Sequence, residues 1–391
     1  MNRANLTGVK SFDISPSLPR ISGVSRRFLI APDKFKGSLT APEAAAAIAE
    51  GIRRIDPDAE LDICPIADGG EGFMETLIST LAGKWVPCPA VDALGREIES
   101  RYVLAQTPEG PTAILEMAET AGLWRLAADE RNPMQATTRG VGLQIVHAIS
   151  EHGARRIILG LGGSATNDGG CGMAAALGIN FLSEIGISVE PVPDNLTAVS
   201  QIDPTSRVTL PEIIAACDVD NPLLGKRGAT AVFSQQKGAS AVDQPILEAA
   251  LQQLVQLSKG ENAALTPGAG AAGGLGFGLL HFTDARLISG FDLLADLLDL
   301  EKRIQAADHV ITGEGSIDHQ SLGGKGPVAL ARMAKSLGKP VTGYCGVADE
   351  EARSSDVFTN LHALADSGLP LETLISQAAL LLTDRVSHSK L

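Results

Sequence analysis

The sequence contains no apolar run that approaches the roughly 20 residues needed to cross a bilayer as a helix. The longer runs, such as 157–161, end after a few residues. A basic excess is also missing, because 32 Lys and Arg residues stand against 46 Asp and Glu residues, for a formal net charge of −14. A nucleic-acid surface needs a positive field to attract phosphates. We therefore expect no membrane and no nucleic-acid partner, although a local Lys/Arg cluster could bind a small anion.

Cysteine and histidine are sparse and form no metal-binding pattern. The five cysteines lie far apart without a CxxC pair, which favours buried free thiols in a reducing cytosol over a disulfide or zinc role. The seven histidines include no HExxH motif, so we expect no His-ligated metal. The P-loop motif GxxxxGK[ST] is absent as well, so an ATP site would need another scaffold. These features predict a cytoplasmic protein.

Length and composition indicate a globular chain of two domains. The 391 residues exceed the usual size of one domain, and the 44% of apolar residues suffices for a large core. The segment 1–25 contains Ser, Pro, several basic residues and a single acid, Asp13. A transit peptide has a similar composition, but this segment has no clear amphipathic period. We predict a disordered extension over 1–25 and exclude it from the fold.

Short apolar runs alternate with helix signals over the rest of the chain. Residues 27–32 predict a strand, and Thr40 as N-cap with Pro42 in the first turn predicts a helix. Further strands are expected at 61–66, 156–160, 213–217, 309–312 and 339–344. Five strands end in turns rich in Asp, Glu or Gly. Because ligands of open α/β sheets bind at the carboxyl ends of strands, the pattern predicts an α/β protein with an active-site rim.

The strongest motif is the run Gly160–Gly170, GLGGSATNDGG, which follows a predicted strand and leads into a helix. Glycines allow positive φ and bring N–H groups near an anion, and the helix N-terminus adds partial positive charge. Ser164 and Thr166 could donate to oxygens, and Asp168 could face a magnesium ion. The structural alternative is a tight turn whose polar residues cap the helix. We favour ligand binding, because a plain turn does not need the polar run SATND.

A second Gly-rich stretch, Gly268–Gly276, formally contains GxGxxG. A dinucleotide fingerprint needs a strand directly before it, whereas 265–267 is a poor strand. We expect a flexible or closely packed loop that opens a helix. An NAD(P)-dependent hydroxy-acid dehydrogenase, with Asp292 as the ribose partner, remains an alternative. So does a non-catalytic sugar-acid sensor, which has no need of so many carboxylates.

Charged residues cluster at the predicted strand ends. The run 33–38, DKFKGS, suits an anion or phosphate, with a solvated turn as the alternative. Arg139, at a helix start, could hold a carboxylate by a bidentate fork or be a surface residue. Carboxylates at strand ends or turns are Asp33, Asp68, Asp168, Asp218, Glu314 and Asp318. Magnesium favours one or two carboxylates together with waters and phosphate oxygens, so a few of them suffice.

Taken together, these motifs resemble the type 1 glycerate kinases of bacteria. The matches follow the family's order from about residue 27 to 350. They are Ala31-Pro32-Asp33 with Phe35-Lys36 and Ser38-Leu39, 67–72 (ADGGEG), Thr138-Arg139-Gly140, 162–170, 217–219 with 221–223, 236–239 (QKGA), 267–274, and 311–315 with Asp318, 320–321 and Lys325. Ser316 and Asp220 depart from the family, which commonly has Arg and an uncharged residue there, and the segment 1–25 has no family counterpart.

The resemblance implies ATP-dependent phosphorylation of D-glycerate with magnesium, at the 2-hydroxyl to give 2-phosphoglycerate. Phosphorylation at the 3-hydroxyl, or of a related small hydroxy acid, is the alternative. It also implies two α/β domains with the active site in the cleft between them. A flavodoxin-like domain is expected from both chain ends, 26–70 and 290–391, with an inserted domain over 71–289. The oligomeric state is expected to be a monomer or homodimer.

Each motif then receives a role in phosphoryl transfer, which mainly needs in-line positioning and charge neutralisation. The predicted phosphate site consists of Gly162, Gly163, Ser164, Thr166, Asn167, Gly169 and Gly170 together with Lys36. Magnesium is assigned to Asp168 or Asp218. Glycerate is assigned to Thr138, Arg139, Glu314 and Asp318, with Arg139 on the carboxylate. Either Asp33 or Asp68 would orient the acceptor hydroxyl.

Overall fold

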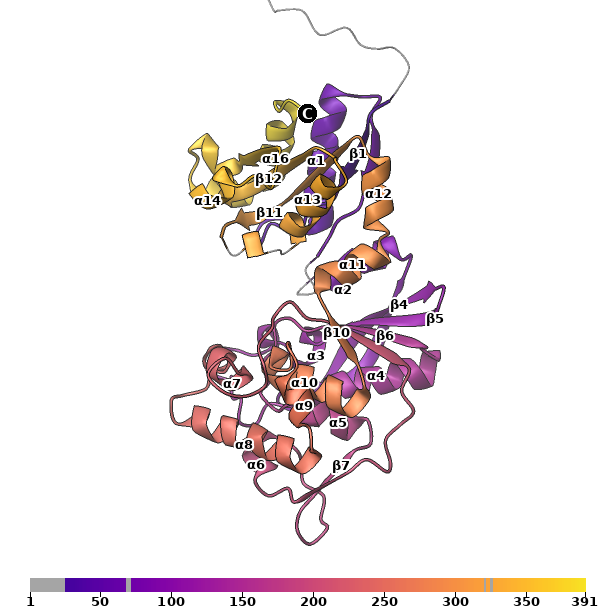
Figure 1. Ribbon diagram of the computed structural model, residues 1–391, viewed down its shortest axis with the longest axis vertical. Coiled ribbons are helices and arrows are strands. Elements are labelled where there is room, and N and C mark those ends of the chain that lie inside the picture. The colour runs from indigo at the N-terminus through magenta and orange to yellow at the C-terminus, as the bar shows by residue number, and fades with distance from the viewer. Residues whose placement is uncertain (1–24, 68–71, 320, 324–325) are drawn as a thin grey trace, which may run out of the picture.

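The computed structural model describes residues 25–67, 72–319, 321–323 and 326–391. Except for Ser25, the predicted extension 1–25 lies outside the described residues, as do Asp68 and Lys325. Two α/β units are stacked along the long axis of the molecule (Figure 1). The upper one, called the first unit here, contains strands from both parts of the chain, at 27–63 and 309–363. The lower, inserted unit contains the sheet strands between them, 84–288. The predicted fold class is confirmed.

Five strands of the described chain form the sheet of the first unit, in the order β13-β12-β11-β1-β2, and all neighbours are parallel. They are β1 (Arg27–Ile30), β2 (Glu60–Ile63), β11 (His309–Ile317), β12 (Val341–Ala348) and β13 (Asn360–Ala363). Counted within the sheet, this is the flavodoxin-like order 2-1-3-4-5, whose ligands bind where the order reverses, beside the first and third strands. In this chain that point lies between β1 and β11.

Strand β11 is longer than the sequence indicates. The predicted strand stops at Thr312, before a turn at 313–315, but the structure continues it to Ile317 in parallel register with β12 up to Ala348. Gly313 permits this, because a Cβ there would lie 1.9 Å from the Tyr344 carbonyl oxygen. The run GEG is therefore a close strand contact and not a turn.

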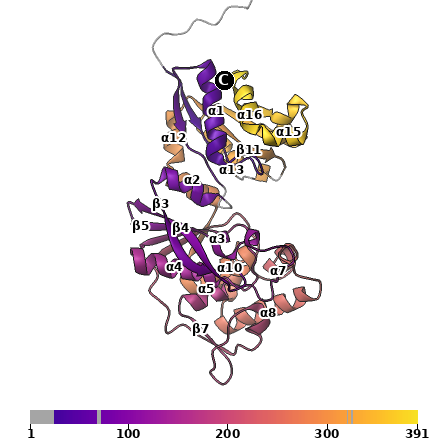
Figure 2. The same cartoon turned by 180° about the vertical axis from the view of Figure 1, so that it is seen from behind.

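Helices cover both faces of the first sheet, with α1 and α16 on one face and α12 and α13 on the other (Figures 1 and 2). The elements outside the sheet are α1 (Ala41–Ile55), α12 (Leu300–Ala306), η3 (Ser321–Gly323), α13 (Gly326–Ser336), α14 (Glu350–Ser354), η4 (Leu364–Ser367), α15 (Leu371–Ser376) and α16 (Ala378–Ser387). As predicted, α1 begins after Thr40. Thr40 and Glu43 form a capping box, in which each side chain accepts a hydrogen bond from the other residue's backbone N–H.

The inserted unit is built on a six-stranded sheet within the described residues, in the order β10-β9-β6-β5-β4-β3. Its strands are β3 (Lys84–Val91), β4 (Glu97–Thr107), β5 (Gly110–Glu116), β6 (Arg156–Gly160), β9 (Glu212–Ala216) and β10 (Arg286–Ile288). The four strands β5, β6, β9 and β10 are parallel neighbours, whereas β3, β4 and β5 form an antiparallel meander. The meander is not predicted from the sequence. The strands β6 and β9 lie at their predicted places.

The remaining elements of the inserted unit are mostly short helices around this sheet. They are α2 (Phe73–Thr80), α3 (Ala118–Ala121), η1 (Leu123–Arg125), α4 (Arg139–His152), α5 (Cys171–Ala176), α6 (Pro193–Leu196), α7 (Ala229–Phe233), η2 (Gln235–Lys237), α8 (Asp243–Ser258), α9 (Glu261–Leu265), α10 (Ala271–Thr283) and α11 (Gly290–Leu297), with a hairpin of β7 (Asn180–Leu182) and β8 (Gln201–Asp203). The Gly268 loop thus follows helix α9 and not a strand, which removes the structural basis of a dinucleotide fingerprint.

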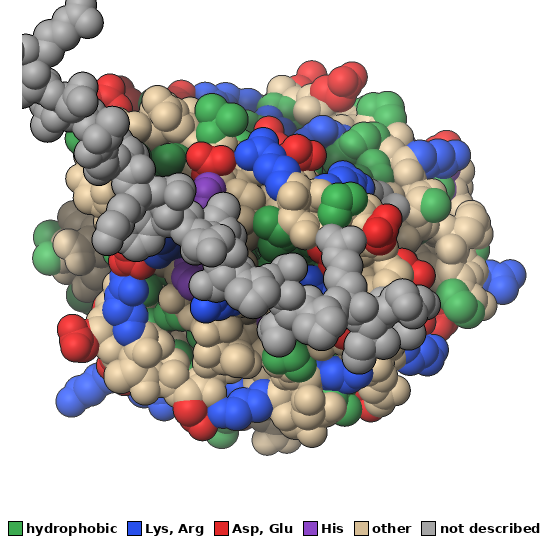
Figure 3. Space-filling model, turned by 90° about the horizontal axis from the view of Figure 1, so that it is seen from above, with side chains coloured by type: hydrophobic (Ala, Val, Ile, Leu, Met, Phe, Trp, Pro, Cys, Tyr) green, Lys and Arg blue, Asp and Glu red, His purple; other side chains and the backbone are tan. Residues whose placement is uncertain are grey.

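The core and surface agree with the composition. All five cysteines are free, and four of them are buried, as predicted. In the part of the chain that the structure describes, no helix has the length and apolarity to cross a membrane. Acidic and basic side chains are interspersed over the visible, non-grey part of the face in Figure 3. Helix α11 contacts β9 of the inserted sheet, and α12 contacts β1 of the first sheet. The domain boundaries near 70 and 290 stay predictions.

Candidate functional site

The carboxyl ends of the parallel strands in the inserted sheet lie in one row. Glu116 pairs with Gly160, Gly160 with Ala216, and Ala216 with Ile288. The segments that follow these residues therefore emerge at the same edge of the sheet. They include the turn 161–170 and Asp218, which the sequence singles out, and they also place Glu116 at this edge.

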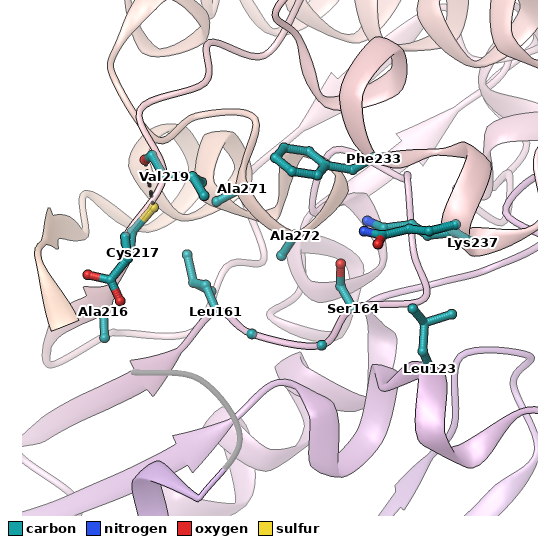
Figure 4. A pocket seen from close by; sticks show the side chains of 14 residues that line it. Leu123, Leu161, Ser164, Ala216, Cys217, Val219, Phe233, Lys237, Ala271 and Ala272 are labelled. Atoms are coloured by element: carbon teal, nitrogen blue, oxygen red, sulfur yellow. Dashed lines mark hydrogen bonds between the residues drawn. The ribbon is translucent and has the colours of Figure 1, made fainter. Parts of the chain in front are cut away.

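A cavity of about 330 Å³, called the turn cavity here, lies at this edge (Figure 4). Its lining consists of Leu123, Leu161, Gly162, Gly163, Ser164, Ala216, Cys217, Asp218, Val219, Phe233, Gln236, Lys237, Ala271 and Ala272. Backbone, small side chains and a few polar groups dominate this wall. Such a surface lets an anion approach main-chain N–H groups closely.

The Gly160–Gly170 run divides into two parts. Residues 162–164 line the turn cavity, whereas Thr166, Asn167 and Asp168 are fully buried behind it. The Thr166 hydroxyl donates to the Ala272 carbonyl (3.4 Å), and the Asn167 amide donates to the Thr230 hydroxyl (3.1 Å). These side chains thus hold the turn against neighbouring segments.

Asp168 is held by four hydrogen bonds. Its Oδ2 accepts from the backbone N–H and hydroxyl of Thr138 (2.8 Å each) and from Gly172 N–H (3.1 Å), and its Oδ1 accepts from Gly170 N–H (3.1 Å). Burial raises the pKa of Asp168, while these donors lower it. The Thr138 hydroxyl also accepts from Met173 N–H (2.9 Å), so both side chains join the starts of α4 and α5. The geometry favours a structural role for Asp168 and Thr138 over the predicted metal and substrate contacts.

The Gly268–Gly276 stretch, to which the sequence assigns no role, packs against the Gly160–Gly170 run. Three successive residues from Ala272 to Gly274 are left-handed, with φ of 53°, 69° and 90°. Gly169 N–H donates to the Gly273 carbonyl (3.1 Å), and a Cβ on Gly273 would lie 1.8 Å from the Thr166 carbonyl oxygen. Only glycine permits that approach. Left-handed Ala272 lines the turn cavity, and strained residues of this kind concentrate at functional sites.

Lys237 is a cavity residue whose role the sequence analysis missed. It follows α7 in the short helix η2, is 1% exposed, and its Nζ donates to the Thr166 carbonyl (2.7 Å). Burial lowers the pKa of Lys237 to about 7, and the charge of Asp168 opposes that shift. The QKGA run was the available signal, but nothing local in it shows that the lysine is buried.

A second, larger cavity of about 600 Å³, called the interunit cavity here, is lined by residues of both units. The first unit contributes the 33–43 loop and helix start together with Ala67, and the inserted unit contributes 72, 75–76, 101, 116, 118–119 and 124. Asp33 N–H donates to the Gly313 carbonyl (2.8 Å), which fixes the loop beside β11. The cavity therefore lies at the switch point between β1 and β11.

Glu116, like Asp33, is a buried carboxylate in the lining of the interunit cavity. One of its oxygens accepts from Met74 N–H (2.7 Å) at the start of α2. Burial raises the pKa of Glu116 to about 7, with opposing effects of the Met74 hydrogen bond and Lys34 and additional raising by Glu75 and Glu119. Glu116 is not singled out by the sequence, because the strand β5 that ends at this residue is not predicted. A carboxylate that titrates near neutrality can exchange protons with a substrate.

Among the described residues, the interunit cavity is lined by the cations Lys34, Lys36 and Arg101. Arg101 forms ion pairs with Glu75 (3.0 Å) and Glu119 (3.4 Å), and its guanidinium lies 4.0 Å from the centre of the Trp85 ring. Lys36 is exposed. The cavity thus offers cationic side chains for an anionic ligand beside the Glu116 carboxylate, whose pKa burial raises to about 7.

One short segment, 118–124, separates the two cavities. Ala118 and Trp124 line the interunit cavity, and Leu123 lines the turn cavity. Leu123 N–H donates to the Gly163 carbonyl (2.9 Å), and the Trp124 indole donates to the Ala118 carbonyl (2.9 Å). Ligands in the two cavities would therefore be neighbours across this segment.

The other predicted site residues lie elsewhere or in supporting positions. Among the described residues that line the two cavities, Arg139, Glu314 and Asp318 do not appear. Arg139 faces Glu190 at 4.0 Å, and the Asp318 carboxylate accepts from Ser321 N–H (3.1 Å). Glu314 is half-buried within β11.

Asp33 and Asp218 do line cavities, the interunit cavity and the turn cavity respectively. Asp33 is buried, and the exposed Asp218 accepts from Gly290 N–H (2.9 Å) at the start of α11. Both remain candidates for the roles that the sequence assigns to them.

The fold and these cavities define a class of protein: a two-unit α/β protein with a backbone-lined cavity beside a charged cavity at the junction of its units. Comparison with known proteins gives the family. The chain matches the model of the glycerate kinase family over residues 28–389. The chain belongs to the glycerate kinase family.

Individual relatives agree with this assignment. The chain is 40% identical to a glycerate kinase of Bacillus subtilis strain 168, across 90% of this chain and 94% of that protein. It is 41% identical to a glycerate 2-kinase of Escherichia coli K12, across 82% and 85% of the two chains. Its structure resembles that of a putative glycerate kinase 2 from Salmonella typhimurium LT2, with a TM-score of 0.82 and 35% identity over 93% of this chain and 97% of the other.

Proposed function

We propose that this protein transfers the γ-phosphoryl group of ATP to D-glycerate, at the 2-hydroxyl, giving 2-phosphoglycerate and ADP. Family membership implies a phosphotransferase that acts on an alcohol group and uses ATP. The observation that carries the site assignment is the adjacency of a backbone-lined cradle and a charged cavity at the sheet edges. Phosphoryl transfer needs both, because it depends on positioning the two substrates and neutralising charge.

The nucleotide phosphates are assigned to the turn cavity. Residues 162–164 present main-chain groups there, and left-handed Ala272 faces them from the start of α10. Thr166, Asn167, Gly169 and Gly170 support this surface from behind. In this proposal Asp168 positions the turn and does not bind metal, since protein donors engage both of its carboxylate oxygens.

Magnesium fits the exposed carboxylate of Asp218 in the same cavity. Among the described residues, no group of three or more His, Cys, Asp or Glu could hold a metal ion. That agrees with magnesium, which binds proteins through one or two carboxylates and takes its other ligands from phosphates and water. When bound, the ion would neutralise charge on the phosphate oxygens.

D-Glycerate is assigned to the interunit cavity. Its carboxylate would face the cations Lys34, Lys36 and Arg101, in place of the sequence-based assignment to Arg139. The Glu116 carboxylate would take the hydroxyl proton while the hydroxyl oxygen attacks the γ-phosphorus. The new P–O bond forms as the bond to the β-phosphate oxygen breaks, and ADP leaves. Asp33 orients the acceptor from the first unit, and Asp68 lies outside the described residues.

A coupled assay of ADP release tests the reaction. Purified protein with ATP, magnesium and D-glycerate should release ADP at a rate well above that without acceptor, whereas L-glycerate and D-lactate should give lower rates. Phosphorus NMR of the product then distinguishes the 2-phosphate from the 3-phosphate. ADP release that does not depend on any hydroxy acid would overturn the proposal.

A further inference from the structure

Lys237 is a buried cation in the wall of the turn cavity that the mechanism above does not use. Its side chain extends beside Ser164, across from Phe233 and Ala272 (Figure 4). The main chain of Lys237 is fixed at the end of η2, because its N–H donates to the carbonyl of Ser234, the residue before η2 (3.0 Å). Its position is therefore set by the fold and not by a flexible loop.

The surroundings of Lys237 leave capacity for another acceptor. An ammonium group has three N–H donors, and in the described part of the chain the Thr166 carbonyl accepts from one of them. The charged groups around it are Asp168, whose oxygens bind Thr138, Gly170 and Gly172, and Asp218 in the same cavity. The Arg131 guanidinium also contacts η2, donating to the Gln236 carbonyl (3.5 Å).

We propose that Lys237 is a phosphate-binding residue of the nucleotide site, with Nζ donating to a phosphate oxygen held at Gly162–Ser164. This inference rests on the proposed placement of ATP phosphates in the turn cavity. A buried cation needs a compensating negative charge, and a phosphate that enters the cavity brings one. The N–H groups of the turn and a single lysine point charge would then share the phosphate.

Calorimetric binding of ATP, pyrophosphate and adenosine tests this proposal. Lys237→Met and Lys237→Gln should each weaken ATP and pyrophosphate binding about 10- to 100-fold, the loss expected for a hydrogen bond between charged groups. Adenosine binding should stay within about two-fold of wild type, because adenosine has no phosphate. Lys226→Met is the matched control: it removes the charge of an exposed lysine outside the cavity and should leave all three affinities unchanged.

Two results would overturn the proposal. One is wild-type affinity for ATP and pyrophosphate in both Lys237 variants. The other is a purely structural effect, in which both variants lose adenosine and ATP affinity equally or fail to fold. These binding measurements use no glycerate, so they separate this inference from the proposed reaction. If the wild type binds ATP through Lys237 but does not phosphorylate D-glycerate, the proposed function fails while the inference stands.

Discussion

The turn cavity and the interunit cavity are neighbours across segment 118–124 but are built differently. Glycine backbone, small side chains and a buried hydrogen-bond network form the first, and ionisable side chains from two units line the second. The network behind the turn fixes a shape, whereas the interunit cavity contains the Glu116 carboxylate, whose pKa burial raises to about 7. The difference teaches that similar Gly- and Asp-rich turns can have different consequences. In the turn cavity the turn is held by buried hydrogen bonds, whereas the loop at Asp33 brings charged side chains to the interunit cavity.

The largest expected effect is that of Glu116→Gln on turnover. Loss of a general base lowers kcat about 10²- to 10⁴-fold. Because burial raises the pKa of Glu116 to about 7, the fraction of carboxylate grows as pH rises, so wild-type kcat should increase through pH 7 and the variant's should not. A pH series of the ADP-release rate measures both.

The matched control is Glu109→Gln, which alters an exposed carboxylate before the other end of β5. It should keep wild-type kcat and pH dependence. The raised pKa of Glu116 means that ionising this carboxylate costs the wild type stability as pH rises from about 4.5 to 7. Glu116→Gln removes that ionisation, so the variant should remain folded at pH 8. Wild-type turnover in Glu116→Gln would remove the interunit cavity from the chemistry.

Gly273→Ala should instead act on stability. A Cβ at this position would meet the Thr166 carbonyl at 1.8 Å in a left-handed backbone, so we expect a loss of about 3–5 kcal/mol in the free energy of unfolding. Gly186→Ala introduces the same left-handed strain, at φ +77° with nothing within 4 Å, and should cost about 1–2 kcal/mol. Denaturant titrations of the two variants give the comparison. Equal losses would show that the packing of the turn tolerates a side chain.

Asp168→Asn and Asp218→Asn separate scaffold from metal within the turn cavity. Asp168→Asn should lower the free energy of unfolding by about 2–3 kcal/mol, because an amide nitrogen cannot accept from the surrounding donors. Asp218→Asn should unfold like wild type, since the Asn amide oxygen can also accept from Gly290 N–H, but should need about ten-fold more magnesium for half-maximal rate. Normal stability with a raised magnesium requirement in Asp168→Asn would restore the sequence-based metal assignment.

The smallest effect is expected for cations around glycerate. Lys36→Met should raise the KM for glycerate about ten-fold, because it removes a charged donor from the interunit cavity. Arg139→Met removes a cation that faces Glu190 away from both cavities and should leave this KM unchanged. Steady-state kinetics at saturating ATP compare the two. A raised KM in Arg139→Met with a wild-type KM in Lys36→Met would instead support Arg139 as the residue that binds the glycerate carboxylate.

Local signals in the sequence predict several elements well. The apolar run before Pro32 becomes β1, Thr40 caps α1, and the strand at 156–160 leads through the Gly-rich turn to α5. In each case residues within a few positions decide the outcome. The sequence predicts a turn at the GEG run, but β11 continues through it. Glycine is required at position 313 by the close contact with Tyr344 on β12 and not by a turn.

The cavity residues that the sequence does not single out depend on contacts far along the chain. Glu116 becomes a buried carboxylate through Met74, 42 positions away, and Lys237 is buried through its bond to Thr166, 71 positions away. Conversely, the sequence predicts a metal ligand at Asp168, yet its Oδ2 accepts hydrogen bonds from Thr138, the residue before α4. Residue type alone does not distinguish a carboxylate that binds a ligand from one that holds the scaffold.

The Gly and Asp turns, their order and the absence of a strand before Gly268 are properties of the sequence alone, and they sufficed for the α/β class and the family resemblance. The tertiary structure decided which of those turns faces a cavity, because burial and hydrogen-bond satisfaction are collective results of packing. It placed β1 beside β11 across more than 270 positions of sequence, and this pairing creates the switch point at which the two units meet. Burial in the lining of this junction raises the pKa of Glu116 to about 7.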